Sequence, residues 1–239
     1  MPELLRTVEQ ADRDGLDHFS LPDHPYLGER LDAYAAIGFV LGRTRHIAGI
    51  ANVSNLPTRP APMLARTVTT LSALSGGRVV LGMGAGSLWD RIADLGVDRL
   101  SPGEAVDAFE EAIVLIRSLG GGGAPVTHRG RHYRIDAIEP APVAVPPVWT
   151  GSVGRKSLAA TGRVADGWIP GHAADWLSER YRESRPVIDA VLEHGASGFT
   201  LFPSGDEAPE VTVGRWAGEV VPAVREAVAK EYGAAPGSP

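Results

Sequence analysis

The apolar residues of the chain recur in two alternating patterns. In one, they lie three or four positions apart, as Leu64, Val68 and Leu71 do, which is the spacing of one helix face. In the other, a short unbroken run such as 79–81 is typical of a buried strand. Together they predict helices over about 2–15, 31–41, 64–75, 102–119, 156–164 and 216–228, strands at about 16–21, 47–53, 79–81, 148–150, 168–169 and 199–202, and a hairpin over 127–135.

Certain residues indicate where these elements begin and end. Ser101 and Glu104 have the spacing of a capping box, with a proline at the first helical position between them. Gly76 stops the helix before it, and Gly130 marks the turn of the hairpin. Pro222 lies inside the last predicted helix, where it either kinks that helix or marks its true start.

Alternation of near-continuous apolar strands with helices predicts an α/β fold built on parallel strands. Two architectures remain open at this point, a closed (β/α) barrel and a doubly wound open sheet. In both, functional residues follow the carboxyl ends of the strands. Four segments of this chain therefore become candidates: 23–24, 54–55, 84–86 and 152–155.

Composition excludes several classes of protein. The chain has 239 residues, 44% of them hydrophobic, a net charge of −6 and no Cys, so neither disulfides nor Cys-ligated metal sites can form. The acidic balance does not predict nucleic-acid binding. The first residues do not resemble a signal peptide, and no apolar run approaches the ~20 residues of a membrane span. We therefore expect a cytoplasmic protein without a membrane or nucleic-acid partner.

Asp23 and His24 form the best candidate pair for moving a proton. A histidine titrates near neutrality, and an adjacent carboxylate can orient or charge it. A structural role in a surface loop is the alternative. The other histidines are scattered, and the turn between His128 and His132 spoils a helical metal pair, so we expect no metal site.

Two glycine-rich segments follow predicted strands. Residues 82–86 read Gly-Met-Gly-Ala-Gly, which suits either a ligand-facing turn or a plain tight turn. Residues 151–156 read Gly-Ser-Val-Gly-Arg-Lys before a predicted helix. There a helix N-terminus, a hydroxyl and two cations come together, which suits a phosphate, although a capped helix with solvated basic residues fits as well.

Seven stretches of the sequence resemble the bacterial luciferase-like family of flavin- and deazaflavin-dependent oxidoreductases. They are residues 11–24, 60–67, 74–86, 109–112, 130–133, 147–151 and 165–170, in the family's order. The most specific are Leu-Ser-Gly-Gly-Arg-Val at 74–79 and Ala-Asp-Gly-Trp at 165–168. Beyond about residue 172 the likeness is thin.

The resemblance implies that residues 1–239 form one (β/α)8, TIM-barrel-like domain, incomplete here because only about six strands are recognisable. It implies that Asp23 and His24 lie beside the reactive part of a flat redox ring, and that Ser54 and Asn55 fall where the family has a non-proline cis peptide. The further residues that it implies in cofactor binding are Gly84, Ala85 and Gly86, which would face the ring or tail, and Ser152, Val153, Gly154 and Arg155, which would hold the phosphate.

The resemblance thus predicts an oxidoreductase that acts on a small organic substrate, which the sequence does not specify. With the deazaflavin coenzyme F420 the reaction is hydride transfer, in which His24 handles the proton and Asp23 orients it. With reduced FMN it is monooxygenation. Two alternatives remain: a non-catalytic flavin-binding or scaffold protein, and an NAD-binding open sheet. The edges of an incomplete barrel need cover, which predicts a homodimer.

Overall fold

The computed structural model describes residues 2–169 and 208–232. Residues 18–169 belong to one compact unit, and residues 2–17 and 208–232 belong to another. The first unit contains all the predicted site residues, and each unit is described by itself.

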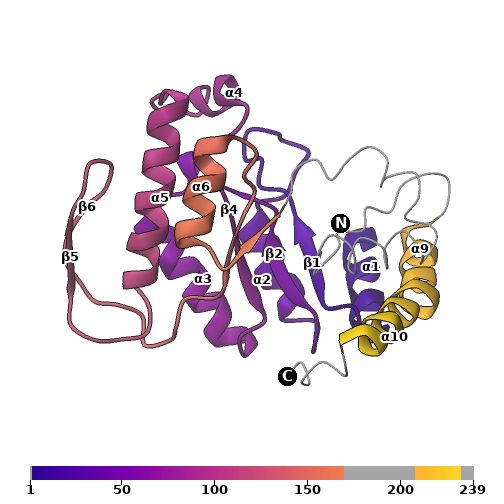
Figure 1. The fold of residues 1–239 in the computed structure, drawn as a ribbon. Helices are drawn as coiled ribbons and strands as arrows, with labels where there is room; N and C mark the ends of the chain where they lie inside the picture. The colour runs from indigo at the N-terminus through magenta and orange to yellow at the C-terminus, as the bar shows by residue number, and fades with distance from the viewer. Residues whose placement is uncertain (1, 170–207, 233–239) are drawn as a thin grey trace. The chain divides into compact units, whose positions relative to one another are not determined.

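The first unit is built on a parallel sheet (Figure 1). Its strands are β1 (His18–Leu21), β2 (Ala48–Ala51), β4 (Val79–Gly84), β7 (Val148–Thr150) and β8 (Gly167–Trp168), in that spatial order. The two-residue β3 (Ser54–Asn55) continues the line of β2 along β4, since β2 pairs with residues 79–80 and β3 with residues 83–84. Every pairing in this sheet is parallel.

The strand order separates the two predicted architectures. Consecutive strands lie side by side, without the reversal that creates the switch point of a doubly wound sheet. The helices α2 (Ala33–Leu41), α3 (Ala61–Ser75), α5 (Pro102–Ser118) and α6 (Arg155–Val164) also contact one another in chain order. Both features are those of a singly wound (β/α) barrel. Across the described residues the sheet does not close, and β1 and β8 lie at its two ends.

The core of this unit lies between the sheet and these helices. All six residues of β4 are buried, as expected for the middle of a sheet covered by helices. Ile37 of α2, Leu64 of α3 and Phe109 of α5 are also buried. Burying each such side chain contributes about 1.5–3 kcal/mol, so the helices hold β4, and with it the loop that follows, in place.

The local start and stop signals are confirmed. Ser101 Oγ accepts a hydrogen bond from the backbone N of Glu104, and the Glu104 carboxylate accepts one from the backbone N of Ser101. Gly76 ends α3 with φ of 70°, a left-handed conformation that glycine adopts at little cost. The hairpin forms from β5 (Val126–Arg129) and β6 (Arg134–Ile138).

Three details differ from the predicted elements. The strand predicted over 47–53 is interrupted, because residues 52 and 53 leave the ladder between β2 and β3. A short helix, α4 (Trp89–Ala93), follows the glycine segment where no regular helix was predicted.

At Pro222 the helix is not simply kinked. A π-helical turn, Trp216–Val220, precedes α10 (Val221–Tyr232), so proline lies in the first turn of α10, where its missing N–H costs little. The strand predicted at 199–202 lies outside the described residues.

The second unit contains helices alone among its described residues. α1 (Pro2–Arg13) packs against α9 (Pro209–Arg215), and Arg6 Nε lies 3.4 Å from Glu210 Oε1. Asp17 pairs with Arg225 of α10 at 3.2 Å. Among the described helices of the whole chain, none is long and apolar enough to cross a membrane.

Candidate functional site

The parallel sheet brings the predicted segments to one edge. Because all its strands run the same way, the loops after β1, β3, β4 and β7 leave from the same side of the sheet. His24 follows β1, Asn55 ends β3, Gly84 ends β4, and Gly154 follows β7. Segments up to about 130 residues apart in the sequence therefore begin at a common edge, as the strand pattern predicts.

Asp23 is the buried charged group at this edge. Its side chain is 1% exposed and forms a two-pronged ion pair with Arg59, with Arg59 Nε 2.7 Å from Oδ2 and Nη2 2.7 Å from Oδ1. The backbone N of Asn55 also donates to Oδ2, at 3.0 Å. Both oxygens of a buried carboxylate are thus satisfied by a cation and a backbone donor, as burial of a charge requires.

These contacts give Asp23 partners other than His24. Its carboxylate joins the loop after β1 to Arg59 and to β3, and its hydrogen bonds go to them rather than to His24. The physical reason is that a guanidinium binds both carboxylate oxygens at once, which a neighbouring imidazole cannot do. Asp23 is therefore a group that holds two strand-end loops together.

Arg59 extends this connection to α2. Its Nη2 lies 2.8 Å from Oδ2 of Asp32, whose other oxygen caps α2 by accepting from the backbone N of Ala35. The guanidinium also lies 4.9 Å from the centre of the Tyr34 ring. The hydrogen bond with Asp23 raises the pKa of Arg59 above its ordinary value, although burial opposes this. Arg59 is consequently a permanent cation at the centre of the cluster.

His24 has a different partner. A turn joins the carbonyl of His24 to the backbone N of Leu27 at 3.0 Å, with Pro25 in the second position, where proline is favoured. The turn brings Tyr26 back over the imidazole, so that Nδ1 of His24 lies 2.7 Å from the Tyr26 hydroxyl. The two ring centres are 5.5 Å apart. This loop sets the orientation of the imidazole without a carboxylate.

The non-proline cis peptide lies between Asn52 and Val53, two residues before the position that the resemblance implies. The side chain of Val53 fills the space beside two glycines. A Cβ on Gly84 would lie 2.7 Å from Val53 Cγ2, and one on Gly151 would lie 3.1 Å from Val53 Cγ1. Glycine at these two positions therefore leaves the room that Val53 occupies, and the approach is closest at Gly84.

Ser54 and Asn55 are both buried, as residues of a packed strand end. The hydroxyls of Ser54 and Tyr34 lie 2.5 Å apart, and burial raises the pKa of Tyr34 well above its ordinary value. Asn55 is only 6% exposed, yet its side-chain oxygen Oδ1 is buried without a hydrogen-bond partner among the described residues. Such an orphan acceptor costs about 1–3 kcal/mol until a donor reaches it.

The glycine segment 82–86, at the end of β4, is explained largely by internal packing. Gly86 has φ of 100°, and a Cβ there would lie 2.8 Å from Pro57 Cγ. A Cβ on Gly82 would overlap the carbonyl oxygen of Ala51. Ala85, between these close approaches, is half-buried. The structure thus supplies a protein-packing reason for the glycines of the segment.

The start of α6 is open by comparison. Gly154 is its N-cap residue, and no side chain caps the helix. A Cβ on Gly154 would meet only Ser157 Oγ, at 3.7 Å, so there is room in front of the first turn. Val153 is 69% exposed, and Arg155 is exposed without an ion pair in the described part of the chain. Uncapped N–H groups at a helix start suit an anion.

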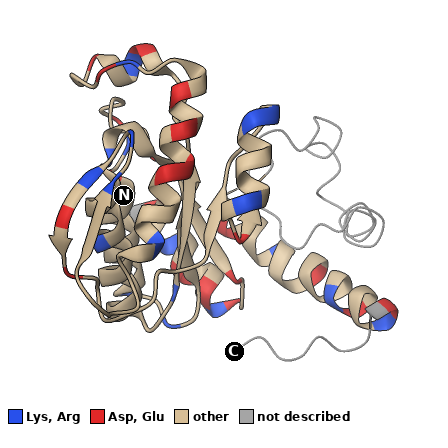
Figure 2. Cartoon of the chain, turned by 60° about the vertical axis from the view of Figure 1, so that its left-hand side comes forward, with Lys and Arg blue, Asp and Glu red and all other residues tan. Residues whose placement is uncertain are grey.

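Two of the residues predicted around this helix start are occupied elsewhere. Ser152 is 3% exposed, and its hydroxyl lies 2.9 Å from that of Thr161 inside the unit. Lys156 pairs with Asp107 of α5 at 2.6 Å. Acidic residues recur along α5, seen as red bands in Figure 2, and a second one pairs with Arg163 of α6. The anion-binding groups that remain are backbone N–H groups and Arg155.

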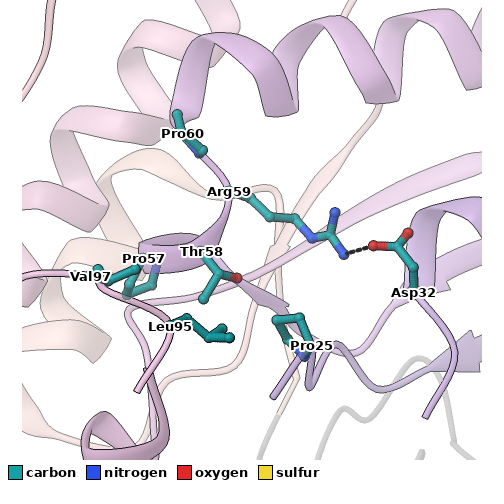
Figure 3. A pocket seen from close by; sticks show the side chains of 8 residues that line it. All are labelled: Pro25, Asp32, Pro57, Thr58, Arg59, Pro60, Leu95 and Val97. Carbon is teal, nitrogen blue, oxygen red and sulfur yellow. Dashed lines mark hydrogen bonds and ion pairs between the residues drawn. The ribbon is translucent and has the colours of Figure 1, made fainter. Parts of the chain in front are cut away.

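A pocket of about 340 Å³ adjoins the Arg59 cluster. Figure 3 shows Arg59 reaching toward Asp32 on one side of it, with Thr58 and Pro57 on the same loop and Pro25 opposite. It is lined by Pro25, Asp32, Pro57, Thr58, Arg59, Pro60, Leu95 and Val97. Pro25 directly follows His24, so the pocket begins one residue from the predicted proton-handling group.

Sequence reasoning missed Arg59, Tyr26 and Tyr34. Arg59 lies between Pro57 and Pro60 in the loop after a strand. A cation there has no acidic residue one helical turn away, so it pairs with residues from other parts of the chain. Tyr26 could have been found from Pro25, which favours a turn that returns the next residue to His24. Tyr34 gives no such signal, because an aromatic residue in an apolar helix is most often core.

The chain is similar to known proteins over most of its length. A family model described as luciferase-like monooxygenase matches residues 1–231. The "F420-dependent glucose-6-phosphate dehydrogenase" of Microbacterium testaceum is 31% identical over 199 residues, which cover 80% of this chain and 58% of that protein. The chain therefore belongs to the luciferase-like monooxygenase family.

Solved structures show the same fold. An "F420-dependent secondary alcohol dehydrogenase in complex with an F420-acetone adduct" superposes with a TM-score of 0.60 and 23% identity, covering 69% of this chain and 52% of that one. An FMN complex of the oxygenating constituent of 3,6-diketocamphane monooxygenase from Pseudomonas putida gives a TM-score of 0.56 and 19% identity, covering 68% and 50%. The chain thus has the luciferase-like, TIM-barrel-like fold, with a parallel sheet that does not close across the described residues. It spans about half the length of these relatives.

Proposed function

We propose that this protein is an oxidoreductase that uses coenzyme F420, or FMN, on a small organic substrate. The observation that carries the proposal is that an uncapped helix start at Gly154 and a histidine in the loop after β1 lie at the same sheet edge of a luciferase-like chain. F420 is favoured over FMN because the similar sequences include F420-dependent dehydrogenases of 30% and 31% identity.

The residues present fit such a cofactor on two counts. The first turn of α6 offers backbone N–H groups that no side chain caps, with Arg155 beside them, which suits the phosphate of either coenzyme. Asn55 Oδ1 is a buried acceptor that lacks a donor, and a ring N–H would satisfy it. When bound, the deazaflavin supplies hydride transfer and reduced FMN supplies monooxygenation.

In this proposal each group of the chain has a definite task. Gly154 and Arg155 bind the phosphate, while Val153 lies exposed beside them. Gly84, Ala85 and Gly86 shape the loop over which the cofactor lies, and Ser54, Asn55 and Ser152 are its buried supports. His24 exchanges a proton with the substrate, and Asp23 holds the loop that carries His24 through Arg59.

The test is equilibrium titration of the pure chain with F420 and, separately, with FMN, read by absorbance and fluorescence. Saturable binding of F420 with a change in its absorbance supports the proposal, and saturable binding of FMN alone would select the monooxygenation alternative. A chain that binds neither would refute it. That outcome would favour the second candidate, a non-catalytic scaffold.

We further propose that residues 1–239 act as one luciferase-like domain and assemble as a homodimer in the cytoplasm. The family match over 1–231 supports the single domain. Phe39, Met63 and Leu74 on α2 and α3 are 61–81% exposed, an apolar display that supports a protein interface. The net charge of −6 does not favour nucleic acid, and no Cys depends on an oxidising compartment. Analytical ultracentrifugation tests the dimer.

A further inference from the structure

The loop after β1 contains an aromatic hydroxyl that the proposed function leaves without a task. Tyr26 lies two residues after His24, and the turn closed by the Leu27 N–H and the His24 carbonyl folds its ring toward the imidazole. The 2.7 Å separation of Tyr26 Oη and His24 Nδ1 is that of a good hydrogen bond. In the described residues, the other ring nitrogen, Nε2, has no hydrogen-bond partner.

The surroundings of the Tyr26 hydroxyl determine whether it keeps its proton. The side chain of Asn55 favours the ionised form of Tyr26 and so acts to lower its pKa. Burial and the nearby Asp23 carboxylate nevertheless prevail and raise the pKa of Tyr26, so the phenol keeps its proton at neutral pH. A protonated phenol can donate, and Nδ1 of a neutral imidazole can accept, so the Tyr26 proton can go to His24 Nδ1.

We propose that Tyr26 is a positioning residue for His24: by donating to Nδ1, it fixes the ring in the tautomer that carries the proton on Nε2. The inference rests on the proposed function, because it assigns a task within that site. A neutral histidine has two tautomers, and the partner of one nitrogen selects which nitrogen carries the proton. Nε2–H is then the group presented to a substrate oxygen.

The arrangement also serves the charged ring. When His24 takes up a second proton, Nδ1–H becomes a donor and the Tyr26 oxygen can accept it, because a hydroxyl has both roles. The ring is therefore held in the same place before and after a proton leaves or reaches Nε2. Other charged groups near the pair are Asp23 on the same loop and Arg91 of α4, both of which act on Tyr26.

The direct test is the tautomer of His24 in the protein without cofactor, measured by two-dimensional NMR of ¹⁵N-histidine. His24→Asn identifies the His24 signals among those of the seven histidines. At a pH where the ring is neutral, the chain should show Nε2–H as the main form of His24. Tyr26→Phe, which removes one oxygen from a half-buried ring, should shift His24 toward the mixture seen for a free imidazole.

The same variant should lower kcat by about three- to tenfold, the effect of one lost hydrogen bond, with little change in cofactor affinity. Tyr133→Phe on the hairpin is the matched control, and it should leave the His24 tautomer and kcat unchanged. A parent chain with His24 mainly protonated on Nδ1, or a Tyr26→Phe variant with an unaltered tautomer, would overturn the assignment to Tyr26. Failure of the parent to bind either cofactor would instead overturn the proposed function, so the two failures are distinguishable.

Discussion

The sheet edge that carries the site has two regions with different structures, one around β1 and β3 and one at the start of α6. Around β1 and β3, the side chains of Asp23, Ser54 and Asn55 are buried, and the charge of Asp23 is balanced by Arg59. Around the start of α6, Val153 and Arg155 are exposed, and the helix begins without a side-chain cap. One end is held by side chains that contact each other, and the other offers backbone donors to solvent.

This difference suits two tasks within one site. A group that exchanges a proton must be held in position, because a displacement of about 1 Å can cost 10²-fold in rate. A phosphate is bound by N–H groups that the helix itself holds in place, so few further contacts are required. We therefore expect substitutions near His24 to alter turnover or stability, and substitutions near Gly154 to alter cofactor affinity.

The largest effect is expected for His24→Asn. Asparagine keeps a polar group but cannot exchange a proton near neutral pH, so kcat should fall by about 10²–10⁴-fold. Cofactor affinity, measured by titration, should be unchanged. His128→Asn, on the hairpin where Nε2 hydrogen-bonds to Glu111, should leave kcat unaltered. Equal kcat for the parent and His24→Asn would remove His24 from the mechanism.

Gly154→Glu should abolish binding of the cofactor at the other end. The new carboxylate would occupy the space before the first turn of α6 and repel a phosphate there. The variant should fold, because Gly154 has φ of −84° and a Cβ there meets nothing closer than 3.7 Å. Gly162→Glu, in open space on the same helix, is the matched control and should bind normally. Parent-like cofactor affinity in Gly154→Glu would show that the phosphate lies elsewhere.

Arg59→Met tests whether the β1 end depends on its buried ion pair. Asp23 would remain buried without its counter-charge, which should lower the free energy of unfolding by about 3 kcal/mol. Arg163→Met removes an equally two-pronged pair with Glu110, but an exposed one, and should change the urea midpoint little. If both variants lost the same free energy of unfolding, the buried Asp23–Arg59 pair would contribute no more to stability than the exposed Arg163–Glu110 pair. That result would contradict the comparison.

The smallest effect is expected for Asp32→Asn, which keeps a helix cap but removes the charge facing Arg59. Burial alone would raise the pKa of Asp32, but hydrogen bonds from the Ala35 backbone and Arg59 prevail and lower it. A pKa that is lower in the folded chain stabilises the fold at pH values above the pKa of the unfolded chain, about 3.9. This stabilisation is lost as the pH falls through the pKa of the folded chain. The free energy of unfolding of the parent should therefore exceed that of the variant by about 0.5 kcal/mol at pH 7. A difference in unfolding free energy that persisted at pH 2 would contradict the charge interaction.

Strong local signals made much of the fold predictable. The capping box at Ser101, the stop at Gly76 and the apolar run of β4 each depend on neighbours in the sequence, and each appears in the structure. Because the carboxyl ends of parallel strands lie at the same edge of a sheet, the sequence also indicated which loops begin at that edge.

Partner choice could not be predicted in the same way. Asp23 and Arg59 are 36 residues apart, and only the folded chain shows that the carboxylate pairs with this guanidinium and not with the imidazole of His24. Likewise, the glycines after β4 could be read as ligand-facing or tightly packed until Val53 and Pro57 were found against them. Tertiary contacts decide such cases, and local propensity carries no information about them.

The central claim is that the start of α6 binds the phosphate of a cofactor whose ring lies beside His24. A crystal structure of the chain with F420 tests it most directly. We expect phosphate oxygens within hydrogen-bond distance of the backbone nitrogens at residues 154–156, and the deazaflavin ring beside His24 and Asn55. A phosphate bound at another strand end, or a ring remote from His24, would contradict the account.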